Sequence, residues 1–281
     1  MRSSRELGRQ EAVAASLGQL GRLAQFQGRP AAALSSFAEA LKVLRELDDR
    51  RGLAEFTLAA AEVELELGLV SAAGEHLRQA AALLTAGDNR EQQSELARLQ
   101  GEWHLLRGEP GAAREALQRA VQYAGESRGI VALLDARLSA AEEALESGPA
   151  KPALAELVRL HTRAEALGHA RLRLRADELL ARAALATGDL ERAQATARAG
   201  LERAEACGGY SGAYRLHLLL ARALERSGRR PEAAAERGRA ADEIARLSRD
   251  LAPEQRKTFH GIAEEWEVAD RIEARTAAGK G

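Results

Sequence analysis

The sequence predicts an all-α protein, a solenoid of six helical hairpins followed by one further helix, and three observations indicate this fold class. Glycines recur every 40 residues, small residues stand at fixed distances from them, and strong helix formers dominate the composition. Only 3% of the residues are aromatic and 30% are charged. A chain of 281 residues also exceeds the roughly 250 residues at which one hydrophobic core becomes difficult to build, which favours repeats.

The glycine column predicts where each hairpin turns. A glycine ends a helix where the chain needs a left-handed residue, and proline suits the first turn of the helix that follows. Five of the six prolines fall within four residues after one of these glycines. We therefore expect a tight turn between helix A and helix B of each repeat at Gly28, Gly68, Gly108, Gly148, Gly188 and Gly228.

Small residues on either side of the glycine predict close contact between the two helices of a hairpin, because larger side chains would force the backbones apart. Seven residues before the glycines stand Gly21, Ala61, Gly101, Ala141, Ala181 and Ala221, and five after them stand Ala33, Ala73, Ala113, Ala153, Ala193 and Ala233. Nine residues after the glycines, a bulkier side chain is expected to fill the space between neighbouring hairpins: Phe37, Leu77, Leu117 and Leu157 in the first four repeats.

The repeats are expected at about residues 10–48, 49–88, 89–128, 129–168, 169–208 and 209–248, within a repeat domain at 1–250, with turn sequences such as Gly208-Gly209 between them. A solenoid exposes its last apolar face unless a helix covers it. Residues 251–275 are expected to form that capping helix, with Phe259, Ile262, Trp266 and Ile272 on its apolar stripe. Trp266 is interpreted as core packing, or alternatively as part of a docking surface. Residues 276–281 are expected to be disordered.

The first repeat resembles the tetratricopeptide (TPR) signature through Leu20-Gly21, Gly28, Ala33, Phe37 and Ala40, and the resemblance covers about residues 10–247. The period of 40 residues is longer than the usual 34, and is similar to the long repeats of kinesin light chains and of bacterial regulators with TPR sensor domains. The resemblance implies a right-handed, TPR-like α-solenoid. HEAT and armadillo repeats have similar periods but lack the small–glycine–small spacing.

Few residues suggest reaction chemistry. The net charge is −1, and Cys207 is the only cysteine, which excludes an intrachain disulfide and fits a reducing compartment. The sequence shows no signal peptide, membrane span, phosphate loop or pair of histidines at zinc-ligand spacing. His104 is interpreted as structural, and Glu142-Glu143 as solvated rather than catalytic. We expect no catalytic residues, no metal and no cofactor, and a cytoplasmic protein that is not an enzyme.

The resemblance further implies that the A helices line a concave groove where a partner lies. Positions thirteen, ten, six, and three or two before each glycine share one side of helix A. Repeats two to four place there Glu55, Glu62, Glu66, Glu95, Arg98, Glu102, Asp135, Glu142 and Glu146. Repeats five and six place there Arg175, Glu178, Arg182, Arg215, Arg222 and Arg226. These charges predict either a groove for a peptide of dipolar charge, or pairs between adjacent A helices on a solvated face.

The leading functional hypothesis is a protein–protein interaction scaffold or adaptor that binds a protein or peptide in this groove, free-standing or as a module of a bacterial signalling protein. One alternative is a peptide sensor whose superhelix tightens on binding. A second alternative, an enzyme or small-molecule binder, finds no supporting residues. Nucleic acid is not expected as a partner because aromatics for base stacking are scarce. Apolar surface around Leu7, Val13 and Leu17 leaves homo-oligomers through the terminal repeats open.

Overall fold

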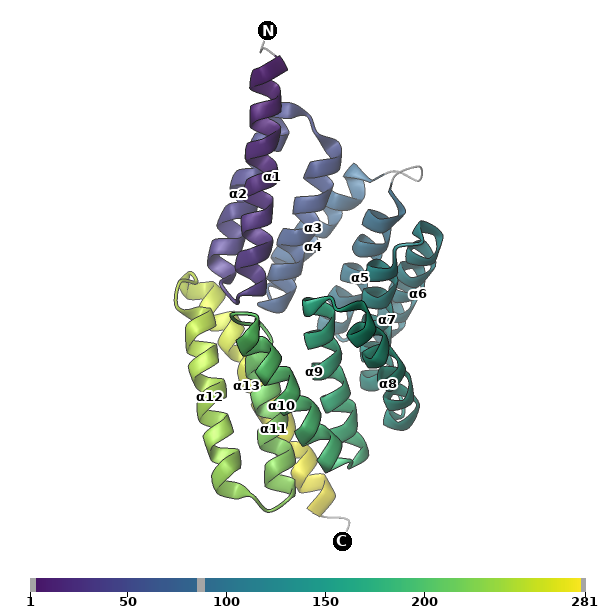
Figure 1. The fold of residues 1–281 in the computed structure, drawn as a ribbon, viewed down its shortest axis with the longest axis vertical. Coiled ribbons are helices and arrows are strands. Elements are labelled where there is room, and N and C mark those ends of the chain that lie inside the picture. Colours follow the sequence, from purple (N-terminus) through teal and green to yellow (C-terminus); the bar gives the residue numbers. More distant parts are fainter. Residues whose placement is uncertain (1–3, 85–88, 279–281) are drawn as a thin grey trace. The chain divides into compact units, whose positions relative to one another are not determined.

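A computed structural model describes the backbone of residues 4–84 and 89–278, and the side chains of residues 6, 8–84 and 89–266. Within these residues the chain forms thirteen α-helices and no strand, which confirms the predicted fold class (Figure 1). Twelve helices form six successive hairpins: α1 (Ser4–Phe26) with α2 (Pro30–Leu47), α3 (Arg50–Glu66) with α4 (Val70–Leu83), α5 (Arg90–Leu106) with α6 (Pro110–Ser127), α7 (Ile130–Ser147) with α8 (Ala150–Leu167), α9 (Ala170–Thr187) with α10 (Leu190–Ala206), and α11 (Ala213–Arg226) with α12 (Arg230–Ser248). The last helix is α13 (Pro253–Ala278).

The chain divides into two compact units, Met1–Glu143 and Ala144–Gly281, and the division falls in the last turn of α7. In the first unit each hairpin packs along the next, so that α2 contacts α3 and α4 contacts α5. In the second unit α8 packs on α9, α10 packs on α11, and α13 contacts both α11 and α12. Most of these contacts join helices that are neighbours in sequence, as expected for stacked repeats.

The predicted glycine turns have a recurring hydrogen-bond pattern. Gly28 adopts a φ of 66°, its N–H donates to the carbonyl oxygen of Gln25 at 2.9 Å, and the N–H of Arg29 donates to that of Ala24 at 2.8 Å. This is the Schellman ending of a helix, which satisfies carbonyl groups that have no partner inside the helix. The same two bonds and a positive φ recur at Gly68, Gly108, Gly188 and Gly228.

Gly148 differs from the prediction, because it is absent from the residues of positive φ. The physical reason is the next residue, Pro149, which has no N–H to donate and which disfavours helical dihedrals in the residue before it. Pro149 is itself extended, with φ −69° and ψ 130°, and α8 begins directly after it. The fourth hairpin therefore turns by a different backbone route at the same place in the sequence.

The turns between repeats contain a second left-handed column that sequence reasoning did not identify. Asp48, Arg128, Gly168 and Gly208 all have positive φ and stand at multiples of 40 residues from one another. Two of them are not glycine, so composition gave no signal. A non-glycine residue in this conformation is uncommon, and here it ends a B helix.

The small-residue columns lie where the sequence predicted. A side-chain Cβ added to Gly21 would approach Phe37 to 2.5 Å, and one added to Gly101 would approach Leu117 to 2.5 Å. The alanines five residues after the glycines are buried. In the second repeat Ala61, Ala73 and Leu77 form one buried cluster with Leu99 of the next repeat. The hairpins are therefore held by close crossing within a repeat and by apolar packing between repeats.

The capping helix is longer than predicted. α13 begins at Pro253 and continues to Ala278, beyond the predicted end at residue 275, and residues 279–281 of the predicted disordered tail lie outside the described part of the chain. Phe259 and Ala263 are buried, and the ring of Phe259 meets that of Tyr214 edge-on at 5.8 Å. Thus α13 covers the last hairpin as expected, whereas the side chain of Ile272 is outside the described residues.

Candidate partner-binding surface

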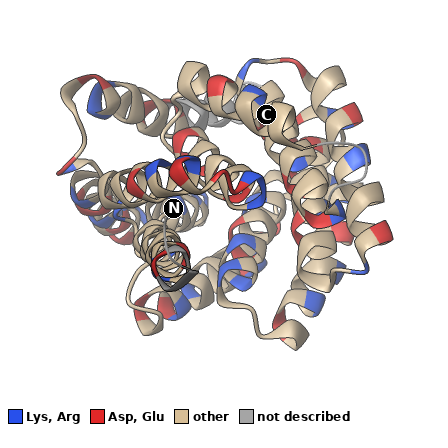
Figure 2. Cartoon of the chain, turned by 90° about the horizontal axis from the view of Figure 1, so that it is seen from above, with Lys and Arg blue, Asp and Glu red and all other residues tan. Residues whose placement is uncertain are grey.

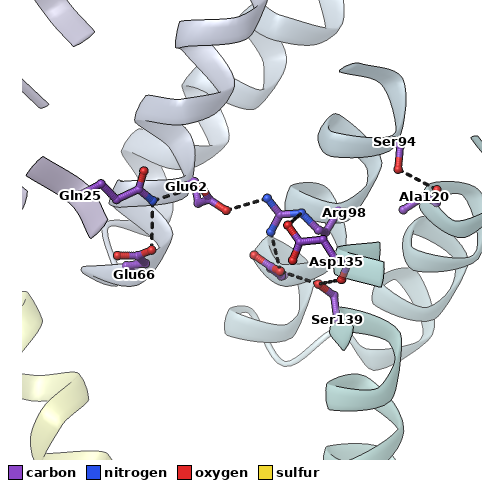
Figure 3. Close-up of polar contacts among 9 residues, drawn as sticks. Gln25, Glu62, Glu66, Ser94, Arg98, Ala120, Asp135 and Ser139 are labelled. Carbon is purple, nitrogen blue, oxygen red and sulfur yellow. Dashed lines mark hydrogen bonds and ion pairs between the residues drawn. The ribbon is translucent and has the colours of Figure 1, made fainter. Parts of the chain in front are cut away.

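Charged residues of both signs occur along many of the helices (Figure 2). In the first unit, side chains of four A helices meet in one polar cluster, here called the A-helix network (Figure 3). Gln25 of α1 donates through Nε2 to Glu62 and to Glu66 of α3, both at 3.1 Å. The hydroxyl of Ser139 in α7 donates to Glu102 of α5 at 2.7 Å. The network therefore joins α1, α3, α5 and α7.

Arg98 is the centre of this network. Its guanidinium donates to Glu62 at 2.7 Å and to Glu102 at 2.9 Å, and its Nε lies 3.7 Å from Asp135. Only 5% of the side chain is exposed. Burial by itself would lower the pKa of Arg98, but the surrounding carboxylates, above all Asp135, outweigh burial and hold this pKa well above its ordinary value. A permanent cation thus holds carboxylates of three A helices together.

The predicted residues of the first unit divide by burial. Glu62, Arg98 and Asp135 are buried, so their charged groups are already engaged with one another and do not face solvent as a partner would require. Glu55 is partly exposed and pairs with Arg22 of α1 at 3.2 Å. The other members of the predicted set within this unit are also partly exposed: Glu66, Glu95, Glu102 and Glu142.

In the second unit, the predicted residues of α9 and α11 pair in the same way. Arg215 lies 2.7 Å from the buried Glu178, which also accepts a hydrogen bond from the Tyr210 hydroxyl at 3.1 Å. Burial would lower the pKa of Arg215. The charge of Glu178, with smaller effects of Tyr214 and Tyr210, outweighs burial and raises this pKa well above its ordinary value. Here, too, an arginine on one A helix neutralises a carboxylate on its neighbour.

Three predicted arginines surround one tryptophan, and together they are called the arginine cluster. The guanidinium carbon of Arg182 lies 5.3 Å from the ring centre of Trp266, and those of Arg215 and Arg222 each lie 5.9 Å from it. Arg222 also donates to the backbone carbonyl oxygen of Trp266. Each cation–π contact contributes about 0.5–1 kcal/mol at an exposed site. Trp266 of α13 therefore lies on the arginines that the sequence assigned to the groove.

The remaining predicted residues of this unit are placed as follows. Arg182 pairs with Glu146 at 2.9 Å. Arg226 is exposed and donates to the backbone carbonyl of Leu185 at 2.7 Å, near the end of α9. Arg175 is partly exposed. Of the two interpretations of the charges, pairing between adjacent A helices therefore holds at several positions, while the partly exposed residues stay candidates for binding.

Sequence reasoning missed Gln25, Ser139 and Tyr210. Gln25 stands three residues before Gly28, which is a position already assigned to the shared face in later repeats, so the first repeat carried a usable signal. Ser139 and Tyr210 fall outside the chosen positions, and only the packing of the helices brings them to Glu102 and Glu178.

The other residues that the sequence singled out either contact neighbouring side chains or are exposed to solvent. His104 contacts Glu109 through Nδ1 at 2.7 Å, and this bond, with a further one from Arg107, lowers the pKa of Glu109. Glu143 is buried and accepts from Arg114 of α6 at 2.8 Å. Cys207 is an exposed free thiol. Among the side chains of residues 6, 8–84 and 89–266, no group of histidine, cysteine and acidic residues is placed to hold a metal. No helix in the described part of the chain is long and apolar enough to cross a membrane.

Comparison with solved structures shows a TPR-like fold. The chain is similar to a Rap protein complexed with competence and sporulation factor, at 12% identity and a TM-score of 0.66, covering 94% of this chain and 88% of that one. It is similar to aspartyl phosphate phosphatase F of Bacillus subtilis, at 16% identity and a TM-score of 0.59, covering 94% and 68%. A third similar structure is a signal transduction ATPase with numerous domains and a tetratricopeptide repeat sensor from Pyrococcus horikoshii, at 12% identity, a TM-score of 0.60, and coverage of 83% and 34%.

No protein-family model matches the sequence, and no curated protein sequence matches it either. The likeness to solved structures therefore rests on backbone geometry, which assigns the fold as TPR-like helical repeats.

Proposed function

We propose that this protein is an interaction scaffold that binds a protein or peptide along the face that the A helices form within each of its two units. The observation that carries the proposal is that side chains from successive A helices meet in continuous polar rows, through Arg98 in the first unit and through Arg215 and Arg182 in the second. Such rows fix the spacing of charges from one repeat to the next. A partner with a complementary charge pattern would be selected by that spacing.

The middle repeats and the C-terminal repeats favour different charges on the partner. Residues 51–168 hold 12 basic and 18 acidic residues, a net charge of −6, while residues 169–250 hold 16 and 12, a net charge of +4. The buried members of the set would hold the face rigid, and the partly exposed ones, such as Glu55 and Arg182, would meet the ligand. The similarity to a Rap protein that is complexed with a factor supports ligand binding by a fold of this kind. A role in bacterial signalling is part of the proposal.

The test compares capture by the wild-type chain with capture by two double variants. Arg182→Glu with Arg222→Glu reverses charges on the A helices, and Arg159→Glu with Arg192→Glu reverses the same number of charges on the B helices. Proteins retained by the wild-type chain from its host would be identified by mass spectrometry and titrated by calorimetry. We expect the A-helix variant to bind at least about tenfold more weakly, and the B-helix variant to bind normally. Equal affinity for all three chains would refute the proposed face.

A further inference from the structure

The end of α13 is held by a different kind of contact from its beginning. Phe259 and Ala263 are buried against the last hairpin, as expected for a cap. The next two residues, Glu264 and Glu265, are exposed, and the last described side chain, Trp266, is partly exposed. Beyond Ala263, the described contacts of α13 with the A helices are therefore those of Trp266 with the arginine cluster.

These contacts do not have the properties of a capping core. The ring of Trp266 lies over three guanidinium groups, and two of the arginines have an acceptor outside α13: Glu146 for Arg182 and Glu178 for Arg215. Arg222 donates to the Trp266 carbonyl, a bond that a carbonyl or acidic oxygen of another segment can replace. A cation over an aromatic face is an electrostatic contact that another aromatic group or an anion can replace, whereas a close-packed apolar side chain leaves a cavity when it moves. The arginine cluster can therefore exchange one ligand for another without unpacking the repeats.

We propose that α13 is an internal ligand: its Trp266 end occupies the arginine cluster on α9 and α11 until a partner segment with an aromatic ring and an acidic or carbonyl oxygen displaces it. The helix would remain anchored by Phe259 while its end moves. The inference concerns regulation of the proposed binding face and rests on that function for its biological meaning, but the occupied state can be tested without any partner.

The size of the expected effect on binding depends on the fraction of molecules in which the arginine cluster is open. A partner that binds only the open cluster must overcome the closed state, so its apparent affinity falls by the fraction of molecules that are open. Weakening the Trp266 contact should therefore strengthen binding in trans, whereas removing the arginines should weaken it. If α13 were only a capping helix, weakening the Trp266 contact would not strengthen binding in trans, and removing the arginines would not weaken it.

The first experiment reads the Trp266 contact directly. The chain contains two tryptophans, so Trp103→Phe leaves Trp266 as the only indole reporter. In this background, Arg182→Gln with Arg222→Gln should raise quenching of Trp266 by the neutral quencher acrylamide by about threefold, because the ring loses the arginine side chains that cover it. Arg159→Gln with Arg192→Gln, which removes the same number of charges from exposed positions of α8 and α10, is the matched control and should leave the quenching unchanged. If the double variant behaves like the control, α13 is not held by the cluster and the proposal is overturned.

The second experiment tests competition in the 281-residue chain. A fluorescent peptide with the sequence of residues 260–278 is titrated into the wild-type chain, into Trp266→Ala, and into Trp266→Ala combined with Arg182→Gln and Arg222→Gln. We expect Trp266→Ala to bind the peptide about tenfold more tightly than the wild type, and the combined variant to lose this gain. Circular dichroism checks that each variant is folded. Equal binding by the wild type and Trp266→Ala would overturn the proposal.

The two proposals can fail separately. If the quenching and peptide results appear as expected but no host protein is captured, the internal ligand stands and the scaffold function falls. If a host partner binds with the same affinity to the wild type and to Trp266→Ala, and the peptide also binds both equally, the scaffold stands and the internal ligand falls.

Discussion

At the scale of single residues, the turn glycines and the glycines inside helices obey opposite physical rules. Gly228 ends α11 with a φ of 79°, where a β-carbon would be strained even though no heavy atom lies near it. Gly238 lies within α12, is exposed, and also has open space at the position of a β-carbon. There, glycine only increases the entropy that the helix loses on folding. A β-carbon would thus find open space at both positions, and only the backbone conformation distinguishes them.

This difference predicts opposite effects for the same substitution. Gly228→Ala should lower the free energy of unfolding by about 1–2 kcal/mol, because alanine is forced into the left-handed region. Gly238→Ala should raise it by about 0.5–1 kcal/mol through helix propensity. Urea unfolding followed by circular dichroism measures both. Two changes of the same sign would show that the left-handed turn does not carry the strain assigned to it.

Arg98 is a buried charge whose removal should be costly because its buried carboxylate partners would remain. Its removal would leave Glu62 and Asp135 buried with no cation between them, which is far more costly than losing an exposed pair. Arg98→Ala should therefore destabilise the chain by about 3–5 kcal/mol.

The comparison variant is Arg78→Ala, whose side chain is 75% exposed beside Glu75, and it should change the free energy of unfolding by less than about 1 kcal/mol. Thermal and urea unfolding of both variants provide the measurement. A small effect at Arg98 would mean that its carboxylate partners find other cations or water.

At the scale of elements, each hairpin is stabilised by the close crossing of its two helices and by an apolar face that the next repeat covers. Gly21 and Phe37 show this crossing: because Gly21 has no side chain, the ring of Phe37 lies directly against the backbone of the first helix. The last hairpin has no following repeat, and α13 takes that place with Phe259. An exposed apolar face would otherwise remain on α11 and α12.

The capping role predicts a large effect at Phe259 and a negligible one close to it. Phe259→Ala should destabilise the second unit by about 3–5 kcal/mol, since it removes a buried aromatic ring. Lys257→Ala, at an exposed position two residues away, should change stability by less than about 0.5 kcal/mol. Hydrogen exchange of α11 and α12 would locate the loss. Unchanged exchange there in Phe259→Ala would exclude α13 as the cap.

At the scale of the whole molecule, contacts run mainly between helices that are neighbours in sequence, so stability should be distributed along the chain rather than held by one core. Leu58 of α3 and Leu218 of α11 occupy the same position, ten residues before their glycines, and both are buried in different units. They form a matched pair for testing how far a disturbance spreads.

Leu58→Ala and Leu218→Ala should each cost about 2–5 kcal/mol locally. In hydrogen exchange followed by mass spectrometry, Leu58→Ala should lower protection in α1 to α5, and Leu218→Ala in α9 to α13, with much smaller changes in the other unit. Equal loss of protection throughout the chain in both variants would instead indicate one cooperative unit.

The sequence alone determined the all-α fold, the hairpin turns and the small-residue crossings, because these depend on the conformation and size of single residues, repeated every 40 positions. It also placed the candidate charges on A helices, where the structure has them. It could not determine which charges pair, since Arg98 meets Glu62 and Asp135 from positions far apart in the chain.

Only the tertiary structure decided that Pro149 changes the fourth turn, that a second column of left-handed residues includes Asp48 and Arg128, and that Trp266 lies on the predicted arginines. The physical reason is common to the charge pairs and to Trp266. A repeat pattern records what each residue does within its own hairpin, whereas contacts between hairpins depend on how whole helices pack, and long side chains reach several partners from one position.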